Sequence, residues 1–168
     1  MSLRILFVAL AILLLSGCIN PFAPERVFSD LDMQPLGDQK SIDGFFQNFL
    51  YAYNMRDTLV YSNLLAEDFI FTYRNYEQNL ELSWSREEDM HTTYRLFNAA
   101  QNLNFIWNEI TSQSGDELNR TIARSFNLTV TFQPTDVVYV TGKVYFILKR
   151  GSEEDNWMLA YWKDDSKY

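Results

Sequence analysis

Large apolar residues and small polar residues alternate over long stretches in the second half of the chain. The clearest stretch places four apolar side chains at every second position: Phe126, Leu128, Val130 and Phe132. This period of two is typical of a strand that buries one face. A proline-containing turn at 134–136 and a charged loop at 151–155 mark the starts of two more strands, over 138–148 and 157–162. The pattern predicts a run of long antiparallel strands.

The region that begins at residue 41 shows helical spacing instead. Ser41 is a favourable N-cap, Asp43 lies in the first turn, and apolar residues recur three and four positions apart up to Tyr53. This spacing predicts a helix over 42–54. The polar stretch 54–57 interrupts the pattern, which then resumes in a second, shorter helix.

Extended and helical segments alternate before the long strands begin. Residues 69–73 have the alternation of a strand, and 105–111 form a further extended segment. Between them, Ser85 and Glu88 match the S-x-x-E capping box, which predicts the start of a third helix. Three residues are expected on its buried face: Met90, Tyr94 and Phe97. No element is predicted over 74–83, where apolar residues become sparse.

The N-terminus carries an apolar run from Ile5 to Leu15 that ends in Leu15-Ser16-Gly17-Cys18. Eleven apolar residues are too few to span a membrane, which takes about 20, but they fit a secretory signal. Residues 15–18 resemble the lipobox of bacterial lipoproteins. The resemblance implies cleavage before Cys18, acylation of its sulfur and attachment to a membrane of the cell envelope. Because Ile19 rather than aspartate follows, it implies the outer membrane, facing the periplasm, if the cell is diderm. An ordinary cleaved signal or a buried helix with an incidental thiol is the alternative.

Composition restricts the remaining choices. With the signal at 1–17 removed, the chain is a proline-containing tether at 18–40 and one domain at 41–168. The full sequence has 22 acidic and 14 basic residues and a net charge of −8, which disfavours nucleic acid as a partner. His91 is the single histidine and Cys18 the single cysteine. We therefore expect no disulfide, no metal site and no cofactor.

The domain resembles the nuclear-transport-factor-2-like superfamily, which includes ketosteroid isomerases, scytalone dehydratase and polyketide cyclases. The resemblance rests on the helix break at 54–57, the Ala-Glu-Asp-Phe start of a strand at 66–69, and the closing strands at 141–150 and 156–165. It implies an α+β, cystatin-like fold. In this fold a curved antiparallel sheet forms a cone around the N-terminal helices, about three of them, and an apolar pocket lies between helices and sheet.

The same resemblance places the catalytic positions of the isomerases on Phe49 and Tyr73. Phenylalanine cannot donate to an oxyanion, and tyrosine is a poor base at neutral pH, so this chemistry is disfavoured. A rearranged site would use His91, whose helix face includes Glu87 or Glu88, or else Glu109 or Tyr73. Otherwise His91 is a solvated helix residue, and Glu109 points either into the pocket or to solvent. The side chains expected to line the pocket are Phe49, Tyr53, Phe71, Tyr94, Trp107 and Phe132.

Together these patterns predict a membrane-anchored lipoprotein that binds a small apolar ligand or another protein without catalysis. The alternative is a lyase, isomerase or hydrolase that acts on a small hydrophobic substrate in the pocket. The strand over 138–148 also has apolar residues on both faces. One face therefore needs a second cover beside the helices, and a homodimer across the sheet is the candidate.

Overall fold

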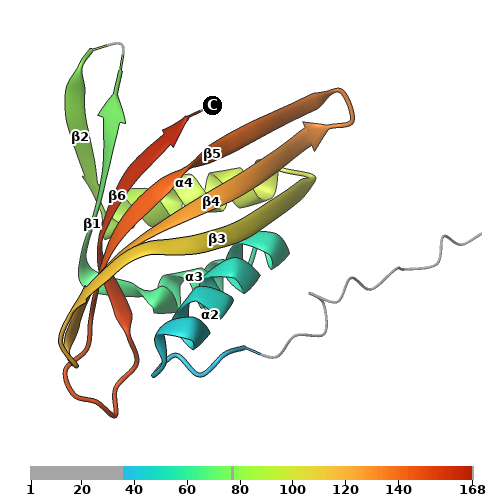
Figure 1. The fold of residues 1–168 in the computed structure, drawn as a ribbon. Coiled ribbons are helices and arrows are strands. Elements are labelled where there is room, and N and C mark those ends of the chain that lie inside the picture. Colours follow the sequence, from blue (N-terminus) through green and yellow to red (C-terminus); the bar gives the residue numbers. More distant parts are fainter. Residues whose placement is uncertain (1–35, 77, 168) are drawn as a thin grey trace, which may run out of the picture.

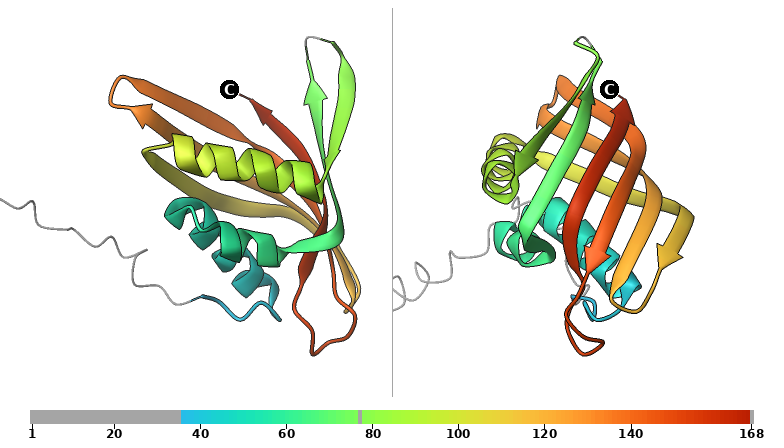
Figure 2. Two further views of the ribbon diagram at one scale, coloured as in Figure 1. Left: turned by 180° about the vertical axis from the view of Figure 1, so that it is seen from behind. Right: turned by 90° about the vertical axis from the view of Figure 1, so that its left-hand side faces the viewer.

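Helices cover one face of a strongly curved sheet (Figures 1 and 2) in the computed structural model, which describes residues 36–76 and 78–167. The predicted signal peptide, Cys18 and most of the tether lie outside the described residues. Within the described ranges, no helix has both the length and the apolar character needed to cross a membrane. The helices and the concave face of the sheet enclose the core between them, as the α+β prediction requires.

The two N-terminal helices lie where the sequence predicts them. Helix α2 (Ile42–Met55) starts after Ser41, whose hydroxyl accepts a hydrogen bond from the Gly44 N–H at 3.0 Å. It ends at Arg56, which takes the left-handed conformation with φ 56°. Helix α3 (Thr58–Leu64) starts at Asp57, whose carboxylate accepts two of the first backbone N–H groups. Local capping thus sets these boundaries.

Helix α4 (Arg86–Ala99) begins after Ser85, as predicted, but the Ser85 side chain forms no capping hydrogen bond. Its buried side chains are Asp89, Thr93 and Phe97. The prediction for Tyr94 is wrong, because its side chain is 55% exposed, whereas Met90 is half-buried and packs against the core beside these residues. The helix is rotated because the Asp89 carboxylate accepts hydrogen bonds inside the cone, where hydrophobic spacing alone would place an apolar residue.

The described strands form one sheet in the order β2-β1-β6-β5-β4-β3. Their bounds are β1 Leu65–Asn75, β2 Leu80–Ser85, β3 Asn102–Gly115, β4 Asn119–Gln133, β5 Asp136–Lys149 and β6 Met158–Lys167. The sheet is mixed rather than wholly antiparallel, because β1 and β6 pair in parallel. The sequence does not predict β2. Leu80, Leu82 and Trp84 do alternate with polar residues along this edge strand, but none of its side chains is buried.

The core is mainly aromatic. Phe49 of α2 has no exposed surface and lies at its centre. Its ring centroid is 4.9 to 5.9 Å from those of Tyr53, Tyr61, Phe105, Trp107, Phe146 and Trp162. Edge-on and offset ring pairs of this kind each contribute about 0.5–1.5 kcal/mol beyond the area that they bury. Phe49, expected to line a pocket, is therefore part of the solid packing beneath it.

The two faces of β5 differ as the sequence suggests. Val144 and Phe146 point inward and have no exposed surface, whereas Tyr139, Tyr145 and Ile147 on the other face are 69%, 37% and 39% exposed. Pairing with β4 and β6 places these outward side chains in the middle of the convex face of the sheet. Among the described residues, no helix lies over this face (Figure 2).

Candidate functional site

A cavity of about 180 Å³ lies inside the cone, between α2, α4 and the concave face of the sheet. Its walls are mostly rings and aliphatic groups, with a few hydroxyl and carboxyl groups. The lining residues are Tyr53, Phe71, Trp84, Asp89, Thr92, Thr93, Leu96, Phe105, Phe126, Leu128, Val140, Trp162, Asp164 and Ser166. An engineered apolar cavity of about 150 Å³ holds benzene. The space in the cone therefore suits a molecule with one ring.

Strand β6 directs two incompletely paired polar groups to this cavity. Trp162, Asp164 and Ser166 alternate along the strand, so their side chains share its concave face. The Ser166 hydroxyl donates to Asp164 Oδ2 at 2.6 Å. Asp164 Oδ1 and the Trp162 indole Nε1 are buried and have no hydrogen-bond partner among the described residues. Burial raises the pKa of Asp164 above its usual range.

Asp89 lies on the opposite wall and has a different environment. Its Oδ2 accepts from the Tyr61 hydroxyl at 2.7 Å, and its Oδ1 accepts from Trp84 Nε1 at 3.1 Å. Burial raises the pKa of Asp89, while these two hydrogen bonds oppose the rise. Both oxygens are already engaged, so Asp89 braces α4 against α3 and β2. Of the two carboxyl groups, Asp164 is the one with an oxygen that no described residue pairs.

Tyr53 of α2 lines the same cavity as the two carboxyl groups. Burial, together with the nearby Asp89 and Asp164 carboxylates, raises the pKa of Tyr53 far above its usual value. Its hydroxyl is therefore protonated at any physiological pH. The cavity thus presents a phenol, an indole N–H and a carboxyl oxygen within an apolar wall, which suits recognition of one polar group on an otherwise apolar molecule.

The residues proposed as catalytic from the sequence lie elsewhere. His91 is exposed on α4, and Glu109 is exposed on β3, so the outward alternative for Glu109 is the one that the structure shows. Tyr73 is half-buried and its ring packs against Trp84 at 5.1 Å and Phe71 at 6.0 Å. None of the three lines the cavity in the cone.

The expected lining residues divide between several places. Tyr53 and Phe71 line the cavity, Phe132 packs against the core, and Trp107 lines a separate groove between α2 and β3. Asp89 and Asp164 were not predicted from the sequence. Signals for both were present: Asp89 shares a helix face with Thr93 and Phe97, and extending the predicted strand beyond residue 162 places Asp164 on the same face as Trp162.

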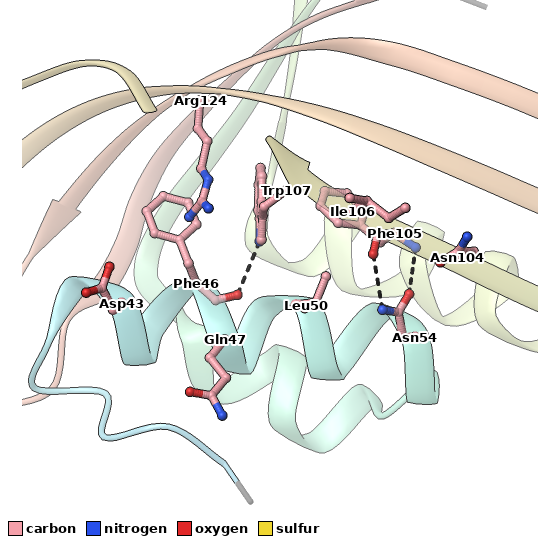
Figure 3. A pocket seen from close by; sticks show the side chains of 10 residues that line it. All are labelled: Asp43, Phe46, Gln47, Leu50, Asn54, Asn104, Phe105, Ile106, Trp107 and Arg124. Atoms are coloured by element: carbon pink, nitrogen blue, oxygen red, sulfur yellow. Dashed lines mark hydrogen bonds between the residues drawn. The ribbon is translucent and has the colours of Figure 1, made fainter. Parts of the chain in front are cut away.

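The groove between α2 and β3 is a second and larger hollow, about 650 Å³, and is open to solvent (Figure 3). Two braces hold its walls together. The Asn54 side chain bonds both the N–H and the C=O of Phe105, at 2.6 and 3.1 Å, and Trp107 Nε1 donates to the Phe46 carbonyl at 3.2 Å. Arg124 of β4 points into the groove toward Phe46. In neither hollow nor elsewhere among the described residues do three or more metal-ligating side chains cluster.

Comparison with known proteins identifies the fold. No family model matches the chain, and no curated protein matches its sequence. Among solved structures, a conserved protein from Planctomyces limnophilus aligns with a TM-score of 0.66 at 18% identity, over 75% of this chain and 93% of that one. A protein from Novosphingobium aromaticivorans, provisionally named a scytalone dehydratase, aligns with a TM-score of 0.65 at 11% identity, over 77% and 83%.

An NTF2-like protein from Rhodospirillum rubrum, described as being of unknown function in nutrient uptake, aligns with a TM-score of 0.62 at 12% identity, over 76% of this chain and 99% of that one. At such low identities the likeness concerns the fold alone. It confirms the architecture that the sequence resemblance implies: the chain has a nuclear-transport-factor-2-like fold.

Proposed function

We propose that the protein binds a small, mostly apolar molecule with a single ring and one polar group in the cavity of the cone, and that an acylated Cys18 anchors it to a membrane of the cell envelope. The cavity volume and its aromatic walls support the size and the apolar character of the ligand. The lipobox-like residues 15–18 support the anchor.

One observation carries the proposal of a ligand. Asp164 Oδ1 and Trp162 Nε1 are buried beside the cavity, and neither atom has a partner among the described residues. A buried polar group without a hydrogen bond costs about 1–3 kcal/mol, so proteins rarely keep one without a compensating function. A hydroxyl group on the ligand has the chemistry to satisfy either atom, because it can donate to the carboxyl oxygen or accept from the indole N–H.

The test compares phenol with toluene, which has the same ring but no hydroxyl, by ligand-observed and protein-observed NMR titration. We expect phenol to bind more tightly. Replacement of the carboxyl in Asp164→Leu should weaken phenol binding about tenfold, the value of roughly one hydrogen bond, and leave toluene binding unchanged. The matched control is Asp165→Leu, at the neighbouring position on the opposite face of β6. Equal affinities for phenol in both variants would contradict the proposal.

Catalysis is the second candidate, and Asp164 is the specific observation that favours it. A carboxyl group with a raised pKa and a free oxygen, next to an N–H donor in an apolar cavity, has the parts of a general base and an oxyanion donor. Such a pair would remove a proton from the carbon next to a carbonyl group, while the indole N–H stabilises the enolate oxygen.

Deuterium exchange at the α-carbons of cyclohexanone in D2O tests this candidate, because exchange requires only the proton transfer. We expect exchange above the buffer rate that rises with pH as Asp164 ionises and that disappears in Asp164→Asn. Exchange at the buffer rate, with binding retained, would eliminate catalysis of this kind and leave the binding proposal in place.

A further inference from the structure

We propose a second ligand site that is separate from the cone cavity: the groove between α2 and β3 binds a single-chain aliphatic carboxylate, and Arg124 is the charge partner of its head group. The groove is lined by five apolar side chains and five polar or charged ones, and the cation among them, Arg124, lies near one end (Figure 3). An amphiphile with a small anionic head and an unbranched chain matches that arrangement.

The position of Arg124 within β4 is the first argument. It lies on the concave face of the strand between Ile122 and Phe126, which are 0% and 4% exposed. Its guanidinium carbon lies 4.6 Å from the ring centroid of Phe46 and 5.3 Å from that of Trp107. Burial removes part of the hydration of the Arg124 charge and lowers the pKa of this group. A partly desolvated cation gains strongly from an anionic partner.

Among the described residues, that partner position is open. Arg124 Nε donates to the Asn108 carbonyl at 2.9 Å, but no carboxylate among the described residues forms an ion pair with the guanidinium. Asp43, which lines the same groove, acts on Arg124 only through longer-range attraction. The two terminal nitrogens are thus available for the bidentate geometry with which arginine binds carboxylates.

Asp43 also affects which anionic head group the groove can bind. The described lining contains one positive side chain, Arg124, which can pair with one negative charge, and one negative side chain, Asp43, which repels added negative charge. A dianionic phosphate would need a second cation and would be repelled by Asp43. A carboxylate is therefore favoured over a phosphate head group.

The backbone at the edge of β3 favours a small molecule over a peptide as the ligand of the groove. A peptide that added a strand to the sheet would pair with the free backbone groups of this edge strand. Within the groove, however, the Asn54 amide already occupies both the N–H and the C=O of Phe105. The remaining apolar wall, made by Phe46, Leu50, Ile106 and Trp107, suits an alkyl chain.

The experiment titrates the purified full-length protein with decanoate, decanol, decyl phosphate and decylammonium, and follows the tryptophan indole N–H signals by NMR. The signals are assigned with Trp→Phe variants. We expect decanoate to bind most tightly and to shift the Trp107 signal while that of Trp162 in the cone cavity stays in place. Arg124→Met should weaken decanoate binding about tenfold or more and leave decanol binding unchanged.

Two further variants keep the outcome interpretable. Arg120→Met makes the same change four positions earlier on the same strand and outside the groove, and should bind decanoate normally. Arg124→Lys retains the charge without the bidentate fork, and should give an intermediate affinity if Arg124→Met fails to fold. Undiminished decanoate binding by Arg124→Met, an equal loss in Arg120→Met, or a shift confined to Trp162 would each overturn the proposal.

Discussion

Replacing Asp89 by alanine tests whether this buried carboxyl organises the wall of the cone. Asp89 is 3% exposed and accepts one hydrogen bond from Tyr61 and one from Trp84. The variant leaves the fully buried Tyr61 hydroxyl without its acceptor, which costs about 1–3 kcal/mol. It also leaves the half-buried Trp84 N–H without its acceptor, which costs about 1 kcal/mol or less. Removal of a desolvated carboxyl offsets part of this cost. We expect a net loss of about 2 kcal/mol in the free energy of unfolding.

The pH dependence of that loss has a definite sign. The pKa of Asp89 is higher in the folded than in the unfolded protein, so the contribution of this carboxyl is fully present below its unfolded pKa and declines as pH rises through its folded pKa. The difference between wild type and Asp89→Ala should therefore be largest in acid and shrink toward neutral pH. Other carboxyl groups cancel in this difference.

Urea denaturation followed by tryptophan fluorescence between pH 4 and pH 8 measures both quantities; a loss of about 2 kcal/mol lowers the midpoint by about 1 M. The variant Glu88→Ala, exposed on the same helix turn, is the control and should change stability by less than about 0.5 kcal/mol. The double variant with Tyr61→Phe should cost less than the sum of the two single changes. A loss for Asp89→Ala below about 0.5 kcal/mol, or one that grows as pH rises, would refute the reasoning.

Four further outcomes are expected. Asn54→Ala should lower stability by about 1–2 kcal/mol and speed hydrogen exchange at the Phe105 amide, because the brace on the β3 edge is lost; unchanged exchange there would contradict this. Gly142→Ala should lower the thermal unfolding temperature strongly, since the added Cβ would lie 2.4 Å from the backbone of β6. Gly151→Ala should leave that temperature nearly unchanged, because the added Cβ meets only a flexible side chain. Cys18→Ser should abolish both the acyl mass in mass spectrometry and recovery with membranes. Light scattering should show a dimer that dissociates when lysine replaces Ile147 on the convex face; a single-chain mass at high concentration would count against it.

Much of the fold was predictable because its signals are local. Ser41 and Asp57 cap their helices through hydrogen bonds that span two or three residues, so their effect can be inferred from neighbouring letters. The inward alternation from Phe126 to Phe132 likewise depends only on the period of a strand. The parallel pairing of β1 with β6 has no such signal, because it joins segments about 90 residues apart.

The candidate site was predicted less well, because polar residues at buried positions contradict the hydrophobic pattern. Asp89 and Arg124 both take inward positions, and each does so through partners on other elements. Tyr94 was placed inward for the opposite reason: it is large and aromatic at helical spacing, but α4 turns it to solvent. Sequence spacing alone does not show whether a hydrogen bond to a distant residue or the burial of a ring determines which face of a helix is turned inward.

The sequence by itself determined most elements of this domain, with β2 as the exception, and the face that β4 and β5 bury, since caps, turns and hydrophobic periods act over a few residues. It also contains the lipobox-like residues that motivate the proposed anchor at Cys18. Only the tertiary structure decided which polar groups meet. Asp164 and Trp162 each keep one atom unpaired within the described part of the cone, and Arg124 reaches the groove beside α2. Both outcomes arise because the curved sheet and the helices enclose separate spaces whose walls come from remote parts of the chain.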